Sequence, residues 1–268
     1  MCEDHFLALN GKYAAMTTGF QATDRALLRV SGGDAEKFLQ DLVSNDVTSE
    51  GLVYAALLTP QGKYLADFFL HRDGDDFVLD VDQSLAAGLA QRLSMYKLRA
   101  DVDIRPDDSP VWILMSGSDG FQDPRNSNLG RRVYGRKPAF DAIDTLAWEE
   151  LRVAHVIPQS GAELIPNDSY ILECGFERVS GVDFRKGCYV GQEVTARMKH
   201  KTELRKGISG VELGDGSVSV GTDIIRDGKS IGHLTSVAGS AGIAYLRLDR
   251  AGEGMTAGPT SVTLRAPG

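Results

Sequence analysis

The segment Lys186-Gly187-Cys188-Tyr189-Val190-Gly191-Gln192-Glu193 is the stretch around which the fold of this chain is organised. Two glycines bracket its cysteine and predict a tight connection, because glycine allows backbone angles and close approaches that a side chain blocks. Residues 194–200, which follow, are predicted to form a helix. Cys188 would then lie just before a helix N-terminus and beside Arg185 and Lys186, an arrangement that favours the thiolate form.

Cys188 has two interpretations on sequence grounds. Free cysteine is among the residue types most often buried, so the first interpretation is a small core residue that only packs. The flanking cations and glycines favour the second, a reactive thiol or one that faces a ligand.

The same residues carry a family resemblance. With the arginine four residues after its end, the segment resembles the signature of the YgfZ family, folate-binding proteins that support iron–sulfur enzymes and are relatives of the glycine cleavage T-protein, an aminomethyltransferase. The motif positions are Lys186, Gly187, Cys188, Tyr189, Gly191, Gln192, Glu193 and Arg197. The resemblance implies an α+β, T-protein-like fold of three lobes. Two interleaved α+β lobes would occupy residues 1–204, and an antiparallel β-barrel would occupy residues 205–268.

The composition is that of an ordinary globular protein. The chain has 268 residues, of which 42% are hydrophobic and 25% are charged, enough for about two domains. No apolar run approaches the roughly 20 residues of a membrane span, and the N-terminus resembles neither a secretory signal nor a transit peptide. Cys2, Cys174 and Cys188 show no CxxC spacing, so neither a disulfide framework nor a resident metal is expected. We expect the cytoplasm, or the mitochondrial matrix if the chain is eukaryotic.

The charge distribution is uneven. Between positions 185 and 206 there are seven Lys or Arg and two Glu, a net +5, whereas the whole chain carries −8 and the remainder therefore −13. This strip is either a solvated helix face or a site for an anion, such as the polyglutamate tail of a folate, an acidic protein or an RNA backbone. Its cations Lys199, Lys201, Arg205 and Lys206, with His200, suit phosphate or carboxylate. General DNA binding is not expected from the net charge.

Periodicity predicts alternating strands and helices over the first two lobes. Strands are expected at 25–30, 52–58, 64–71, 77–81, 102–105, 111–115 and 131–134, and helices at 34–43, 84–97 and 144–156. The turn Thr59-Pro60-Gln61-Gly62 predicts a hairpin. Residues 1–22 look irregular, and residues 157–179 form a long connection of the kind that often carries function.

The C-terminal part has a different texture. After Lys206 the chain is rich in glycine, with short apolar runs at 208–211, 218–220, 224–225, 231–234, 243–246 and 262–264. This spacing predicts a small antiparallel barrel or sandwich.

Asp67 and Trp148 are the first candidate site residues. Asp67 lies in an apolar strand, where a carboxylate is unfavourable unless it is paired or faces outward. The T-protein family carries paired aspartates in the corresponding hairpin, and this chain has Ala66-Asp67. The resemblance implies that Asp67 acts with Cys188 in the chemistry and contacts the folate. Trp148 is either a core residue or a ring that stacks on a pterin.

Two further residues follow from the resemblance. Arg152 lies in the same predicted helix as Trp148, two residues before Ala154, which takes the place of a pterin-binding glutamate of the T-protein. Asn45 matches the family pattern but is also explained by a simple Asx turn. The resemblance implies tetrahydrofolate, or a related folate, bound by Trp148, Asp67, Asn45 and Arg152.

Three functions remain open. The first is a folate-binding protein that supports assembly or repair of iron–sulfur clusters. Cys188 would lie near the folate and act by redox chemistry, covalent capture or cluster contact. Client or assembly proteins would be its partners, and tRNA modification would be among the processes affected. The alternative is a folate-dependent aminomethyltransferase. One observation speaks against it: Cys188 and Gln192 stand where the T-protein motif has an aspartate and an arginine. The third is a folate-storage or interaction protein without chemistry.

Overall fold

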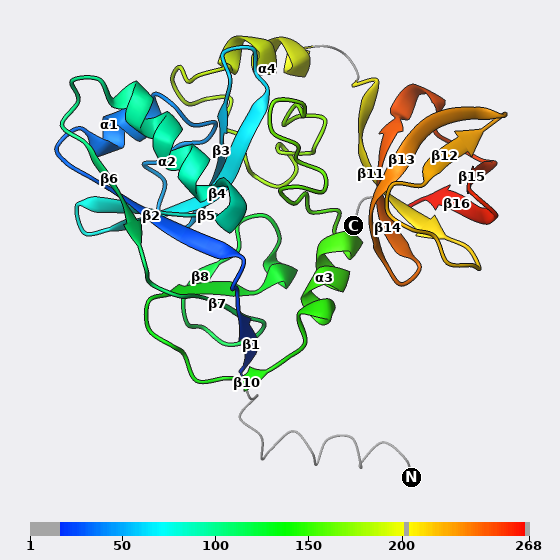
Figure 1. The fold of residues 1–268 in the computed structure, drawn as a ribbon, viewed down its shortest axis with the longest axis horizontal. Helices are drawn as coiled ribbons and strands as arrows, with labels where there is room; N and C mark the ends of the chain where they lie inside the picture. The colour runs from blue at the N-terminus through cyan, green and yellow to red at the C-terminus, as the bar shows by residue number, and fades with distance from the viewer. Residues whose placement is uncertain (1–16, 201–203, 266–268) are drawn as a thin grey trace.

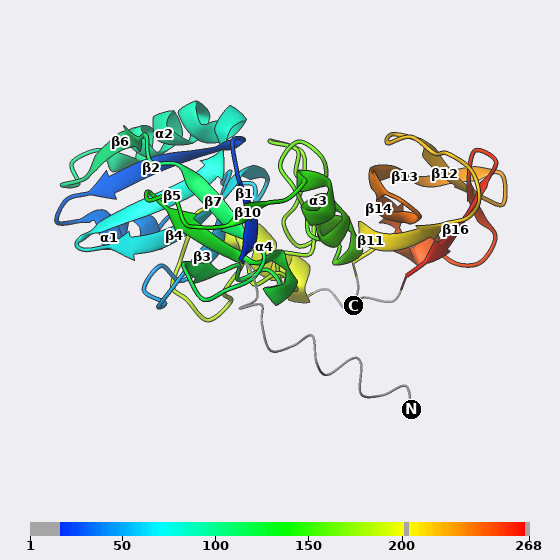
Figure 2. The same ribbon diagram turned by 90° about the horizontal axis from the view of Figure 1, so that it is seen from below.

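The computed structural model describes residues 17–200 and 204–265, and it has three lobes, two built on five-stranded sheets and one a closed barrel (Figures 1 and 2). The T-protein-like α+β fold expected from the sequence is confirmed. The first two lobes are interleaved, because strand β1 (Thr18–Gln21) precedes the first sheet in the chain but belongs to the second.

The first sheet has the strand order β3-β4-β5-β2-β6. Its strands are β2 (Arg25–Ser31), β3 (Val53–Leu58), β4 (Tyr64–Asp73), β5 (Asp76–Asp82) and β6 (Asp103–Asp107). Helices α1 (Ala35–Gln40) and α2 (Gln83–Lys97) share one core with it. The hairpin predicted at residues 59–62 joins β3 to β4.

Strand β3 is buried along its whole length because both faces of its sheet are covered. Ala55 and Leu57 enter the core beneath α1 and α2, whereas Tyr54 and Leu58 enter a second core formed with residues 157–189. The two-residue period of a strand sends successive side chains to opposite faces, so one strand contributes to both cores.

The second sheet has the order β10-β1-β7-β9-β8 and carries helix α3 (Thr145–Ala154) after its last strand. Its other strands are β7 (Val111–Leu114), β8 (Phe121–Gln122), β9 (Arg131–Tyr134) and β10 (Asp141–Ala142), with a short 3₁₀ turn, η1 (Ser127–Leu129). The expectation that residues 1–22 are irregular is wrong for β1. This four-residue strand pairs with β7 and β10, which lie far away in the chain, so no local pattern marks it.

The C-terminal lobe is a closed barrel in the order β11-β14-β13-β12-β15-β16, which removes the free edges of a sheet. Its strands are β11 (Lys206–Leu213), β12 (Asp223–Arg226), β13 (Lys229–Ala238), β14 (Ala241–Arg247), β15 (Met255–Ala257) and β16 (Thr260–Leu264), with a 3₁₀ turn η2 (Leu248–Arg250). The strand expected at 218–220 is not formed. Strand β15 was not expected, since it offers only two buried residues, Met255 and Ala257.

Residues 157–191 contain no long helix or strand and lead into α4 (Gln192–His200). They are held by buried apolar side chains, among them Leu164, Ile171 and Phe176, which pack on the face of the first sheet opposite α1 and α2. Within the described residues, none of the helices combines the length and apolar character that crossing a bilayer requires.

Candidate functional site

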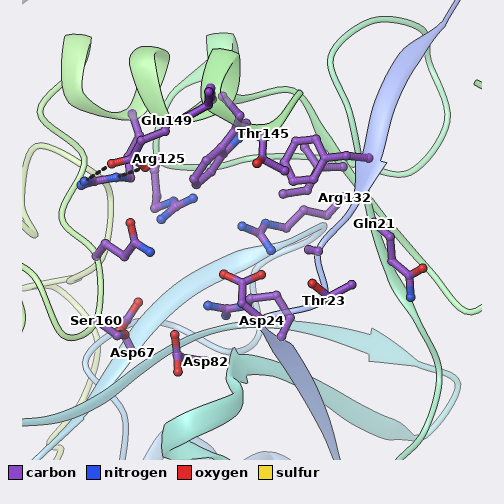
Figure 3. A pocket seen from close by; sticks show the side chains of 18 of the residues that line it. Gln21, Thr23, Asp24, Asp67, Asp82, Arg125, Arg132, Thr145, Glu149 and Ser160 are labelled. Atoms are coloured by element: carbon purple, nitrogen blue, oxygen red, sulfur yellow. Dashed lines mark hydrogen bonds and ion pairs between the residues drawn. The ribbon is translucent and has the colours of Figure 1, made fainter. Parts of the chain in front are cut away.

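A cavity of about 390 Å³ lies between α3, the β1–β2 connection and strand β4 (Figure 3). Its volume is in the range of small-molecule sites. The lining comes from residues 20–25, from one side of α3, from residues 158–160, and from Asp67, Asp82, Ile113, Arg125 and Arg132. The long connection that begins at residue 157 therefore contributes to the cavity wall.

Asp67 is buried at the side of this cavity, 3% exposed, so an outward-facing strand position is excluded. Three hydroxyl groups donate to its carboxylate: those of Tyr54 at 2.9 Å, Tyr64 at 2.7 Å and Ser160 at 2.5 Å. Burial and the neighbouring carboxylate raise the pKa of both tyrosines, so these hydroxyls stay protonated and remain donors. The carboxylate is therefore held in one orientation by three donors, two on Oδ1 and one on Oδ2.

Trp148 lies on α3 and lines the same cavity. Its indole Nε1 donates to the Leu129 carbonyl at 3.3 Å, and its ring meets that of Phe20 edge-on with centroids 6.2 Å apart. The side chain of Asp144 caps the helix by accepting from the Leu146 amide at 2.9 Å. The cap and these contacts hold the indole in place at the cavity wall.

Arg152 also lines the cavity but has no donor left for a ligand. A guanidinium has five N–H groups, and all five are used: two on Glu149 at 2.6 and 2.7 Å, and one each on the Ile157 carbonyl at 2.7 Å, Glu163 at 3.1 Å and the Ser236 hydroxyl at 2.6 Å. Ser236 belongs to barrel strand β13. Arg152 is thus a positioning residue that joins α3 to the barrel.

Asn45 does not line the cavity. Its amide Nδ2 donates to the carbonyls of Tyr54 at 2.8 Å and Ser180 at 2.7 Å, which ties the end of the α1 segment to strand β3 and to the 157–191 connection. Asp67, Trp148 and Arg152 are therefore brought together, whereas Asn45 has a structural role elsewhere.

Sequence reasoning missed three arginines of the cavity: Arg25, Arg125 and Arg132. They come from β2, from the loop after β8 and from β9, and their side chains are 4–11% exposed. No local signal marks them, because Arg25 follows Asp24, Arg132 follows Arg131, and Arg125 lies in a polar loop.

The motif around Cys188 lies on a different part of the molecule. Cys188 is exposed, so the interpretation as a packed core residue is wrong, and it is not among the side chains that line the cavity. Gly191 has φ +84°, and a Cβ there would lie 2.7 Å from the Thr59 carbonyl oxygen, so the motif packs on the β3–β4 turn. Gly187 has open space around it, so the expected close approach there is not observed.

The other motif residues mostly shape this loop. Tyr189 is buried in the second core, and Gln192 donates weakly to the Gly187 carbonyl at 3.5 Å. Glu193 and Arg197 are exposed on α4.

Lys186 does not face the thiol, contrary to expectation. Its ammonium is buried and donates to three backbone carbonyls at the end of the α1 segment: Gln40 at 2.6 Å, Val43 at 2.6 Å and Asn45 at 3.1 Å. Burial lowers its pKa to about 8, so the group is still charged at neutral pH. The charge therefore anchors the Cys188 loop to the first lobe.

We expect Lys186→Met to destabilise the fold by about 2–4 kcal/mol, because three carbonyls lose a charged donor. The measurement is the urea unfolding midpoint at unchanged slope. The matched control is Arg185→Met, whose side chain is 93% exposed and should change stability by less than about 0.5 kcal/mol. Equal effects of the two substitutions would contradict the anchoring role.

The cations of the strip between residues 185 and 206 lie in different surroundings. Arg185, Arg197 and Lys199 are exposed, and Lys199 forms an ion pair with Glu177. Lys201 lies outside the described residues. None of the described cations of the strip lines the cavity, and the polyglutamate track stays a prediction.

Comparison with known proteins gives two independent matches. The model of the CAF17 C-terminal beta-barrel domain matches residues 205–268. In solved structures, the glycine cleavage system aminomethyltransferase T of Bartonella henselae superposes with a TM-score of 0.78 over 94% of this chain and 86% of its own. At 15% identity this likeness shows the fold alone.

Sequence relatives give the family. The chain is 30% identical to the mitochondrial iron–sulfur cluster assembly factor IBA57 homolog of Pyricularia oryzae, over 87% of this chain and 72% of the relative. It is 29% identical to mitochondrial IBA57 of Mus musculus, over 86% of this chain and 77% of the relative. The YgfZ resemblance correctly predicted a family of iron–sulfur proteins related to the T-protein fold. The relatives identify that family more specifically: the chain belongs to the family of the iron–sulfur cluster assembly factor IBA57.

Proposed function

We propose that this protein supports the assembly of iron–sulfur clusters in client enzymes and that Cys188 is the group it presents to a partner or to the cluster. Membership of the IBA57 family carries the first part. The exposure of Cys188, in a loop that Lys186 and Gly191 hold in place, supports the second. A fixed, exposed thiol suits transfer between proteins better than a buried one. The relatives are named as mitochondrial proteins, and we expect that location if this chain is eukaryotic.

We further propose that the cavity between α3 and β4 binds a tetrahydrofolate-type ligand. The residues present fit such a group: an indole and a phenyl ring, Trp148 and Phe20, offer an apolar flank, while Asp67 offers one remaining acceptor position on its Oδ2. Buried guanidinium groups supply donors. A bound tetrahydrofolate would supply one-carbon or reducing chemistry; the chain's own residues bind and orient it.

The aminomethyltransferase alternative has less support. The likeness to the aminomethyltransferase rests on fold, and Ala66, Ala154 and Cys188 stand where the T-protein pattern has carboxylates. This chain therefore lacks three of the carboxylates that the T-protein pattern supplies for that transfer.

Trp148 provides the test of the cavity. Titration with tetrahydrofolate should quench tryptophan fluorescence in the natural protein, and Trp148→Phe should remove most of the signal because Trp112 does not line the cavity. Asp67→Asn should weaken binding about 10-fold to 100-fold, the loss of one charge-assisted hydrogen bond.

The matched control is Glu150→Gln, an exposed α3 residue outside the cavity lining, which should bind as the natural protein does. Quenching that persists in Trp148→Phe, or that is unchanged in Asp67→Asn, would place the ligand elsewhere.

A further inference from the structure

Three guanidinium groups of the cavity gather around one aromatic ring. The central carbons of Arg132, Arg125 and Arg25 lie 3.8, 4.6 and 5.7 Å from the centroid of the Phe69 ring. Each of these arginines lines the cavity. The negative face of an aromatic ring attracts cations, and one ring here contacts three. We call these residues the arginine cluster.

Two buried carboxylates hold the arginine cluster in place. Asp80 accepts from Arg25 Nε at 2.6 Å and from Arg132 Nη1 at 2.7 Å. Asp123 accepts from Arg125 Nε at 3.0 Å and Arg125 Nη2 at 2.8 Å, and lies 3.6 Å from Arg132 Nε. Both carboxylates are 1% exposed. Three positive charges thus face two negative ones.

Asp67 does not pair directly with an arginine of the cluster. Its carboxylate is occupied by the hydroxyls of Tyr54, Tyr64 and Ser160, and within residues 17–200 and 204–265 it forms no ion pair with the arginine cluster. It acts on Arg25 and Arg125 only through the longer-range field. The carboxylates of Asp24 and Asp82 also line the cavity, so what the cluster offers a ligand is unused donors and not an excess of charge.

Each arginine of the cluster has one terminal nitrogen whose donors are not used by the residues that the structure describes. In the described part of the chain nothing accepts from Arg25 Nη1, Arg125 Nη1 or Arg132 Nη2. Arg132 Nε is inaccessible to solvent and has no hydrogen-bond partner, whereas these three terminal nitrogens are accessible to solvent. Figure 3 shows the guanidinium groups of Arg125 and Arg132 directed toward the middle of the cavity. Each terminal nitrogen carries two N–H donors.

We propose that the arginine cluster is an oxyanion site, which binds a carboxylate or phosphate group of the molecule that occupies the cavity. A guanidinium matches both groups in geometry and charge. The hydrogen bond from a guanidinium to an anionic oxygen is also stronger than one to a neutral carbonyl. The carboxylate pairs and the Phe69 ring fix the donors beforehand, which lowers the cost of ordering on binding. The proposal rests on the proposed function in using the same cavity, and it adds the chemical class of the ligand.

Inorganic phosphate and acetate are the probes, titrated calorimetrically into the full chain at constant ionic strength set with chloride. Phosphate or acetate should bind, and Arg125→Lys should weaken that binding about tenfold or more, because lysine keeps a charge near Asp123 but lacks the free Nη1 donors. Arg136→Lys is the matched control. Arg136 is exposed, pairs with Asp119 at 2.9 Å and lies outside the cavity lining, so its variant should bind unchanged. The tighter of the two probes identifies the source of the oxyanion.

Thermal unfolding without ligand shows whether Arg125→Lys is folded, and Arg25→Lys, the most exposed member of the cluster, replaces it if it is not. Equal binding in the cluster variants and the natural protein, or no binding of either probe, would overturn the proposal. A tetrahydrofolate titration separates the two proposals. Phosphate bound without tetrahydrofolate binding supports the oxyanion site and rejects the folate; the reverse result rejects the oxyanion site and keeps the folate.

Discussion

Cys188→Ala should reduce the activities of dependent iron–sulfur enzymes to the level of cells that lack the protein, while the chain still folds. The thiol is exposed and contributes nothing to a core, so stability should change by less than about 0.5 kcal/mol. The loss then comes from the chemistry of the sulfur itself. Complementation of cells lacking this protein, read out through iron–sulfur enzyme activities, is the measurement, with protein level and thermal unfolding recorded in parallel.

Cys174→Ala is the control for thiol chemistry in general. Cys174 is buried, its Sγ donates to the Glu163 carbonyl at 3.3 Å, and burial raises its pKa to about 12, so it stays an unreactive thiol. That variant should retain complementation as long as it folds. Full complementation by Cys188→Ala would favour a storage or interaction protein, in which the cysteine is dispensable.

Arg152→Met should cost about 3–5 kcal/mol of stability, because it leaves the buried Glu163 carboxylate without its cation. Glu163 is fully buried and also accepts from Ser236 of the barrel at 2.7 Å. The substitution therefore removes contacts that connect α3, the 157–163 segment and the barrel. For a chain of this size the unfolding temperature should fall by roughly 6–20 °C.

Two companion variants test the cause. Glu149→Gln removes a partner that is 35% exposed and should cost less than about 1 kcal/mol. The double variant Arg152→Met with Glu163→Gln should recover part of the loss, since the stranded charge is gone. A single variant as stable as the natural protein, or a double variant no better than the single, would show that the buried charge does not dominate.

The elements with strong local patterns could be predicted from the sequence alone. The 59–62 turn predicts the β3–β4 hairpin, and the apolar spacing of α2 brings Leu89 and Leu93 to one buried face. The short runs after residue 206 predict a small antiparallel barrel or sandwich, and the structure forms the barrel. These features depend on residues near one another in the chain, so turn chemistry and periodicity suffice. The motif around Cys188 likewise indicated the broader family.

Contacts between distant segments were decided only by the tertiary structure. Strand β1 exists because β7 and β10 pair with it, and the arginine cluster joins residues from β2, β9 and the loop after β8 around Phe69. The direction in which a long cationic side chain points is also decided by distant residues. Lys186 lies two residues from Cys188 in sequence, yet its ammonium donates to carbonyls more than 140 residues away. A buried charge goes to whichever partners the fold brings within reach, and sequence spacing does not contain that information.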